Sequence, residues 1–322
     1  LMLINDKIFL AGHKDLVGSA FYRVLKKQGF KNILIRDRKD LDLTDKKKVN
    51  NFFKRNKIKI LLICAAKVGG ILSNSKFPYE FLQINTQIQN NLFEAAKYNQ
   101  VNKTMFLGSS CIYPKKSKNP IKENYLLSGY LEKTNEAYAL SKIIGLKFAE
   151  HLIKQYQMDV RCFMPCNLFG YNDKFFDHGN NHVLPALIHR IYEAKIKNLD
   201  EFTIWGDGSP KREFMHADLL AENVIRAMKI SKKKYYDNIS NDYFYNIGSE
   251  YEITINFLTK LITKIIGYKG KIDYDKSKPN GTMRKYMSKE KIKKIINIKT
   301  RDFKIDLKKT INHYIKLRKN KK

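Results

Sequence analysis

Short apolar segments alternate with amphipathic segments through the first half of the chain. The apolar segments are five to eight residues long, which suits strands better than helices. Between them, apolar residues recur at helical spacing, as in residues 19–28 and 46–56. This alternation predicts an α/β protein with a Rossmann-type, doubly wound parallel sheet. The predicted strands are residues 7–11, 32–36, 59–66, 103–108, 159–164 and 244–248.

A glycine-containing turn follows the first predicted strand. Strand, turn, helix and strand succeed one another within about 30 residues, which is the arrangement that binds dinucleotides. The free N–H groups at the start of the helix would face a pyrophosphate. Asp15 stands where the usual motif has its middle glycine, and an acidic residue is electrostatically unfavourable there unless its carboxylate points to solvent. The turn residues expected to bind the cofactor are Gly12, His13, Lys14, Leu16, Val17 and Gly18.

Basic residues at the end of the second predicted strand favour NADP(H) over NAD as the cofactor. An acidic residue at this place binds the ribose hydroxyls of NAD, whereas a basic residue accommodates the 2′-phosphate of NADP. Arg36 and Arg38 stand there, with Lys14 as a further candidate and Asp37 between the two arginines. The residues expected on the adenine side are Asp42 and Leu43.

Tyr138 and Lys142 lie four residues apart in a predicted helix, so both side chains share one helix face. The Lys142 ammonium would lower the pKa of the Tyr138 phenol from its usual value of about 10. Such a tyrosine can transfer a proton to or from a carbonyl or alcohol oxygen near neutral pH. Ser109, after the strand 103–108, could hydrogen-bond the same oxygen. An incidental pair on a surface helix is the alternative, because the chain contains 19 tyrosines and many lysines.

The net charge of +31 raises the question of a nucleic-acid partner. The 62 basic residues are spread along the whole chain, only 11 of them are arginines, and no groove-binding motif occurs. The charge therefore favours acidic ligands such as nucleotides, and we expect no nucleic-acid partner.

Other features of the composition are typical of a large folded domain. The chain has 322 residues, of which 43 % are hydrophobic, enough for a sizeable core. No apolar run reaches about 18 residues, so we expect no membrane insertion, and we interpret the first residues as a strand and not as a signal peptide. The four cysteines lack metal-site spacing, so we expect no metal and reduced thiols in the cytoplasm.

The regular alternation stops after Gly170, which predicts a second, smaller and mostly helical C-terminal domain for the substrate. We predict a dinucleotide-binding domain of residues 1–170 with returning segments at about 214–248. The substrate domain would comprise residues 171–213 and 249–322, approximately. The charged residues 231–242 are expected to form a surface loop.

Several motifs, in order, resemble those of the extended short-chain dehydrogenase/reductases and, within them, of the GDP-L-fucose synthases. The resemblance extends from residue 12 to about 285. It implies an NADP(H)-dependent enzyme that acts on a GDP-4-keto-6-deoxy sugar. The motifs are AAKVGGI at 65–71, LGSSCIYP at 107–114, TNEAYALSK at 134–142, MPCNL at 164–168, HVLPAL at 182–187, WG at 205–206, REF at 212–214 and KPNG at 278–281.

The resemblance implies roles for five catalytic residues. Ser109, Tyr138 and Lys142 resemble the reductase triad, in which Tyr138 would protonate the C4 oxygen as hydride arrives from NADPH. Cys111 and His182 match the family's pair for epimerisation. This pair would invert C3 and C5 through an enolate, with the Cys111 thiolate as base if its pKa is lowered and His182 as its partner.

The binding residues follow from the same resemblance. The implied sugar-nucleotide contacts are Arg190, Trp205, Arg212, Asn280 and Lys285. Asp15, Cys166 and Asn280 depart from the glycine, threonine and aspartate that are usual in the family. Beyond the glycine turn and the second strand, the implied cofactor contacts are Ala65, Ala66, Lys67, Leu107, Gly108, Ser109, Ser110, Tyr138, Lys142, Pro165, Cys166, Asn167, Leu168 and His182.

Two alternatives to a combined epimerase and reductase stay open at this point. The first is a C4-reductase alone, acting on a related GDP-4-keto-6-deoxy-heptose that another protein has epimerised. The second is an inactive homologue that binds cofactor and regulates a partner. The resemblance also implies a homodimer that pairs helices at about 85–99 and 137–155.

Overall fold

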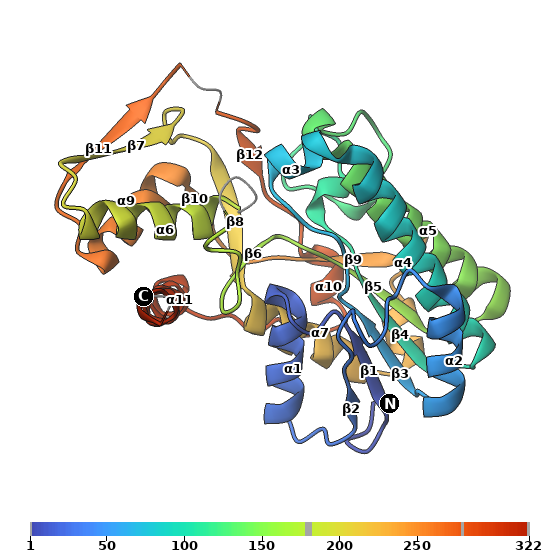
Figure 1. Cartoon of the computed structure of the whole chain (residues 1–322). Coiled ribbons are helices and arrows are strands. Elements are labelled where there is room, and N and C mark those ends of the chain that lie inside the picture. Colours follow the sequence, from blue (N-terminus) through green and yellow to red (C-terminus); the bar gives the residue numbers. More distant parts are fainter. Residues whose placement is uncertain (1, 178–181, 278–279, 321–322) are drawn as a thin grey trace.

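The computed structural model describes residues 2–177, 182–277 and 280–320. A six-stranded parallel sheet forms the centre of the molecule (Figure 1). Its strand order is β2-β1-β3-β4-β5-β9, and it confirms the predicted doubly wound sheet. The strands are β1 (Ile8–Ala11), β2 (Ile33–Leu34), β3 (Ile60–Ile63), β4 (Lys103–Leu107), β5 (Val160–Pro165) and β9 (Phe244–Ile247).

Helices cover both faces of this sheet (Figure 1). The apolar run Ile60–Ile63 is wholly buried because neither of its faces meets water. Figure 1 shows one helical layer made by α1 and α7 and another made by α2, α4 and α5. The helices are α1 (Leu16–Lys27), α2 (Lys46–Asn56), α4 (Pro78–Tyr98), α5 (Glu136–Tyr156) and α7 (Ala217–Lys229).

The strand order reverses at β1. The chain leaves β1 towards β2 on one side and returns to β3 on the other side, where β3 pairs with β1 in parallel. At such a reversal the connections diverge, so a crevice opens beyond the carboxyl ends of the two strands. The predicted glycine turn lies at this position.

A second hydrophobic core lies beside the sheet, between three helices and short strands. One small sheet has the order β10-β8-β12, with β6 paired to β8, and β11 pairs with β7 in another. The helices are α6 (Val183–Ile196), α9 (Ile255–Ile266) and α11 (Phe303–Lys319). The strands are β6 (Asn167–Phe169), β7 (Glu201–Trp205), β8 (Lys211–His216), β10 (Glu252–Thr254), β11 (Lys271–Asp275) and β12 (Arg284–Lys285).

Short elements complete the chain. Helix α10 (Glu290–Lys293) and the residues around it return to the first core, where Met287 and Ile292 are buried. Helix α3 (Ile71–Lys76) follows the β3 turn. No helix within the described residues is both long and apolar enough to cross a membrane.

The expectation of a surface loop at residues 231–242 is wrong in part. The segment contains helix α8 (Lys232–Tyr236), and Tyr235 within it is fully buried. The Tyr235 hydroxyl accepts a hydrogen bond of 2.9 Å from the Cys162 backbone N–H at β5. The neighbouring lysines are exposed and give the segment a charged pattern. The burial of Tyr235 could therefore not be predicted from the sequence.

Candidate active site at the carboxyl ends of the strands

A cleft of about 250 Å³ opens beyond the carboxyl ends of the central strands. Its walls are the glycine turn, the ends of β3, β4 and β5, one face of α5 and the loop before α6. Fifteen predicted site residues line it: Leu16, Val17, Gly18, Ala66, Leu107, Gly108, Ser109, Ser110, Tyr138, Lys142, Pro165, Cys166, Asn167, Leu168 and His182.

The glycine turn has the close packing that a dinucleotide cradle needs. Gly12 has φ +86°, and a Cβ there would lie 2.5 Å from the Ala65 Cα at the end of β3. A Cβ on Gly18 would lie 1.7 Å from the Gly12 carbonyl oxygen. Asp15 is exposed and precedes α1 in an extended conformation, so the acidic residue does not prevent the turn. These residues therefore fit a pyrophosphate at the start of α1.

The basic residues expected near the 2′-phosphate surround the end of β2. Lys14 Nζ lies 2.6 Å from an oxygen of Asp37, and this contact, with the nearby His13, lowers the pKa of that carboxyl. The Arg36 guanidinium lies 5.3 Å from the centre of the Phe52 ring. Arg38 pairs with Asp42 at 3.5 Å. The predicted adenine-side residue Leu43 is held through its carbonyl, which accepts a hydrogen bond from the Asn91 side chain.

Asn85 fixes the turn after β3. Its Oδ1 accepts a hydrogen bond of 2.6 Å from the Lys67 N–H, and its Nδ2 donates one of 3.0 Å to the Lys67 carbonyl. Asn85 is almost wholly buried on α4. One side chain thus satisfies both backbone groups of Lys67. These two hydrogen bonds fix the backbone conformation of the turn that follows Ala65 and Ala66 beside the cleft.

The predicted triad Ser109, Tyr138 and Lys142 comes together in the cleft. Lys142 is buried, and its Nζ donates a hydrogen bond of 2.9 Å to the Leu107 carbonyl at the end of β4. Its Nζ also lies 5.7 Å from the centre of the Tyr138 ring. Burial lowers the pKa of Lys142 to about 8, so its amine is mostly protonated at neutral pH.

The expectation that Lys142 lowers the pKa of Tyr138 is wrong for this structure. Burial, with a smaller effect of Cys111, raises the pKa of the Tyr138 phenol far above its usual value. The cause is the desolvation that a charged phenolate would suffer in the cleft wall. Tyr138 is therefore a neutral phenol, which can donate a proton to an oxygen.

The predicted pair Cys111 and His182 is divided: His182 lines the cleft, whereas Cys111 is not among the residues that line it. Cys111 is buried in the turn after β4, and its N–H donates to Ser109 Oγ at 3.3 Å. Burial raises the pKa of Cys111, although Lys285 and Lys142 oppose the rise, so the condition of a lowered pKa is not met. His182 precedes α6, and desolvation and the Lys174 ammonium lower the pKa of its imidazole.

The predicted sugar-nucleotide residues lie beyond the cleft, on the elements of the second core. Arg190 lies on α6 and donates to the Thr203 carbonyl at 2.8 Å. Trp205, 65 % exposed, ends β7. Arg212 on β8 and Lys285 on β12 are paired residues of neighbouring strands. Asn280 accepts a hydrogen bond of 2.9 Å from the Asp207 N–H next to the turn at Gly206.

Several cleft residues were not predicted from the sequence. Lys174 Nζ donates a hydrogen bond of 2.9 Å to the Val68 carbonyl, and Asn172 donates one of 3.4 Å to the Lys14 carbonyl. The loop after β6 thus contacts both the turn after β1 and the turn after β3. The sequence contained one signal for this loop, namely its position directly after the end of a strand. The further lining residues are Asp15, Cys64, Val68, Gly69, Asn172, Asp173, Lys174, Val183, Leu184 and Phe214.

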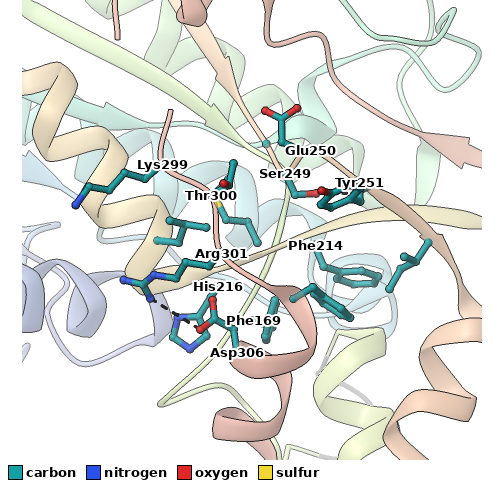
Figure 2. Close-up of a pocket in the computed structure, with 15 residues that line it drawn as sticks. Phe169, Phe214, His216, Ser249, Glu250, Tyr251, Lys299, Thr300, Arg301 and Asp306 are labelled. Atoms are coloured by element: carbon teal, nitrogen blue, oxygen red, sulfur yellow. Dashed lines mark hydrogen bonds and ion pairs between the residues drawn. The ribbon is translucent and has the colours of Figure 1, made fainter. Parts of the chain in front are cut away.

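A smaller hollow of about 50 Å³ lies between β8 and α11 (Figure 2). His216, Arg301 and Asp306 face it, and no predicted site residue lines it. Burial lowers the pKa of His216 to about 4, and its Nδ1 accepts the Asp218 N–H at the start of α7. His216 is therefore a neutral helix cap.

Comparison with known proteins places this chain in a family. Residues 8–248 match the NAD dependent epimerase/dehydratase family. The chain is 46 % identical to a putative GDP-L-fucose synthase 2 of Arabidopsis thaliana over 89 % of this chain and 85 % of that protein. It is 42 % identical to a GDP-L-fucose synthase of Escherichia coli K12, with 88 % of each chain covered.

A solved structure has the same fold over the whole length. It is MlghC, a GDP-mannoheptose C4 reductase from Campylobacter jejuni with NADP bound. The TM-score is 0.89 at 31 % identity, and the match covers 98 % of this chain and 100 % of that one.

Proposed function

The chain belongs to the NAD dependent epimerase/dehydratase family, and on that premise we propose that it is an NADP(H)-dependent reductase of a GDP-4-keto-6-deoxy sugar. The observation that carries the proposal is the joint placement of Ser109, Tyr138 and Lys142 in the cleft at the strand-order reversal. The glycine turn at one end of this cleft fits a dinucleotide. The similar GDP-L-fucose synthases and the NADP-bound C4 reductase support the cofactor and the substrate class.

Each of three cleft residues has its own role in the proposed reduction. NADPH supplies a hydride to C4 when it is bound. Tyr138 donates its proton to the C4 oxygen, for which its neutral phenol is the correct form. Ser109 orients that oxygen, and the Lys142 ammonium stabilises the negative charge that develops there. Lys142 is held for this task by its hydrogen bond to the Leu107 carbonyl.

The proposed function includes epimerisation at C3 and C5 before reduction. A ketone at C4 acidifies the protons on both neighbouring carbons, because the resulting carbanion is an enolate. Cys111 and His182 are the groups proposed to move these protons. Lys285 lies close enough to Cys111 to oppose the rise in the pKa of its thiol, so the Lys285 ammonium favours the thiolate that a base requires.

One observation favours a second candidate, C4 reduction without epimerisation. Burial keeps the Cys111 thiol protonated, and a protonated thiol is a poor base. Under this alternative the substrate arrives already epimerised.

Deuterium incorporation distinguishes the two candidates. The protein is incubated with GDP-4-keto-6-deoxymannose in deuterated water without NADPH, and the sugar is examined by NMR. Deuterium at C3 and C5 supports the combined reaction, with Cys111→Ser as the control that abolishes it. If no deuterium enters but NADPH is oxidised in a second incubation with the already epimerised 4-keto sugar, reduction alone is the function. If neither occurs, both candidates fail.

We further propose a second copy of the chain as partner, through α4 and α5. The two helices pack along each other and leave Tyr98 and Tyr156 largely exposed near their ends. Light scattering after gel filtration would give the mass, and a monomer at micromolar concentration would contradict this proposal.

A further inference from the structure

Glu213 is a buried carboxylate between two residues of the site. It follows Arg212 in β8 and precedes Phe214, which lines the cleft. Successive side chains of a strand point to opposite faces, so Glu213 points away from the face of Arg212 and Phe214. Only 1 % of Glu213 is exposed. Neither the proposed hydride transfer nor the proton transfers use this residue.

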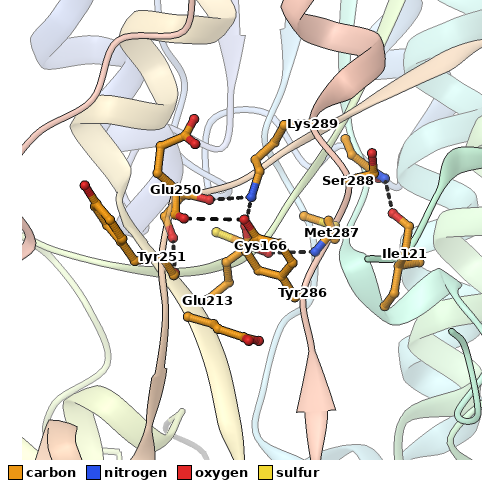
Figure 3. A network of polar contacts seen from close by, with 12 residues as sticks. Ile121, Cys166, Glu213, Glu250, Tyr251, Tyr286, Met287, Ser288 and Lys289 are labelled. Carbon is orange, nitrogen blue, oxygen red and sulfur yellow. Dashed lines mark hydrogen bonds and ion pairs between the residues drawn. The ribbon is translucent and has the colours of Figure 1, made fainter. Parts of the chain in front are cut away.

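Glu213 and Lys289 are the centre of a polar network (Figure 3). One Glu213 carboxylate oxygen accepts the Met287 N–H at 3.0 Å, and the other accepts Lys289 Nζ at 3.3 Å. Lys289, equally buried from water, donates a second hydrogen bond of 2.6 Å to the Ser249 carbonyl. Its Nζ lies 3.7 Å from the centre of the Tyr286 ring. The ammonium is therefore fixed from three sides.

This network joins segments that carry the two halves of the site. Met287 and Lys289 follow Lys285, which pairs with Arg212 across β12 and β8. On the other side, the Glu213 carbonyl accepts a hydrogen bond of 3.1 Å from Asn167, which follows Cys166 in the cleft wall. A Cβ on Gly248 would lie 2.2 Å from a Glu213 carboxylate oxygen, so the end of β9 leaves room for this carboxylate.

Stability alone does not account for such a pair. Removing two charges from water is costly, and apolar side chains of similar size often hold a core equally well. Burial raises the pKa of Glu213 to about 7 even though Lys289 lies beside it. What charged hydrogen bonds add to apolar packing is direction, because donor and acceptor must meet at defined angles.

We propose that Glu213 and Lys289 form a positioning pair that holds Lys285 and Arg212 in register for the GDP-sugar. The inference rests on the proposed function, in which these two cations bind the sugar nucleotide. The pair itself touches no substrate. It acts by fixing the short strand β12 against β8, so that Lys285 stays beside both Cys111 and Arg212.

The direct test is Glu213→Gln, which keeps the shape and the acceptor for Met287 but removes the charge. We expect the KM for the GDP-sugar to rise about tenfold, with the kcat for C4 reduction of an already epimerised sugar and the Kd for NADPH within about twofold of wild type. Lys289→Met should give the same result, and Lys289→Arg, which keeps a cation, should restore the KM. An unchanged KM in folded Glu213→Gln and Lys289→Met proteins would overturn the proposal.

A matched buried pair at the opposite end of β5 controls for a general loss of stability. Asp159 and Arg161 form two hydrogen bonds of 2.8 and 2.9 Å, and Arg161 is fully buried. Asp159→Asn should lower the midpoint of thermal unfolding as Glu213→Gln does, yet leave the KM for the GDP-sugar unchanged. An equal rise of the KM in Asp159→Asn and Glu213→Gln would show that Glu213 has only a structural role.

A double-mutant cycle tests the path through Lys285. In a Lys285→Ala background, Glu213→Gln should change the KM by less than about twofold, because its effect passes through the side chain already removed. Fully additive effects would contradict an action of Glu213 through Lys285.

Calorimetric titration with GDP separates this inference from the proposed function on which it rests. A wild type that binds no GDP overturns the proposed function and the inference together. Normal GDP binding by wild type and by Glu213→Gln overturns the inference alone.

Discussion

The proposed cofactor half and the proposed sugar half of the site are assembled in different ways. The cofactor half consists of turns that directly follow β1, β3 and β4, and its shape depends on neighbours in the same sheet, as at Gly12 and Ala65. The sugar half takes Arg190, Arg212 and Lys285 from segments far apart in the chain, on small sheets and one helix. The first is built by local sequence and the second by tertiary contacts. A substitution in the first half should therefore weaken NADPH binding strongly. A substitution in the second half should weaken GDP-sugar binding to a smaller extent.

Removal of the proton donor should have the largest effect. Tyr138→Phe keeps the ring in the cleft but removes the phenol, so kcat should fall by roughly 10²–10⁴-fold. NADPH binding, measured by fluorescence titration, should stay within about twofold of wild type. Ser141→Ala, one turn away on α5, is the control, because its hydroxyl only bonds the Tyr138 carbonyl. Normal turnover by Tyr138→Phe would contradict the assigned role.

A methyl group in the glycine turn should show how closely the cofactor half is packed. Gly18→Ala places a carbon 1.7 Å from the Gly12 carbonyl oxygen, so the turn must shift. Such overpacking costs about 1–3 kcal/mol, and we expect the Kd for NADPH to rise about 10–100-fold. Gly129→Ala is the control, since its nearest neighbour is Pro114 at 3.4 Å. Equal losses of GDP affinity would show that the two halves are not independent.

Arg212→Lys should separate the sugar half from the cofactor half. Lysine keeps the charge but loses the planar fork that binds two phosphate oxygens. The KM for the GDP-sugar should rise about tenfold, while the Kd for NADPH stays constant. Arg55→Lys on α2 is an exposed control. A larger effect on NADPH than on the GDP-sugar would reverse the assignment of Arg212.

The smallest effect is expected at the edge of the cofactor half. Arg38 is 78 % exposed in its side chain, so Arg38→Ala should weaken NADPH binding only about two- to fivefold. The loss should shrink at high salt, because exposed charges are screened, and NADH binding should not change. An equal loss for NADH would show that Arg38 does not select the phosphate.

The sequence predicted the large sheet and the glycine turn well because their signals are local. Apolar runs with β-α alternation identified the six strands of the large sheet, and the turn from Gly12 to Gly18 followed from its place between strand and helix. The strands β8 and β12 were missed, since Lys211, Arg212 and Arg284 give them a charged pattern. Their pairing depends on partners that no local pattern reveals.

The pKa values of the catalytic groups were decided by the tertiary structure. The spacing of Tyr138 and Lys142 correctly brought both residues to one helix face and into one cleft. Spacing carries no information on desolvation, and burial, not the ammonium, dominates the pKa values of Tyr138 and Cys111. The sequence by itself determined which chemical groups the protein has and along which edge of the sheet they lie. The depth at which each group is buried, and the Glu213–Lys289 contact between distant segments, arise only when the whole chain has packed.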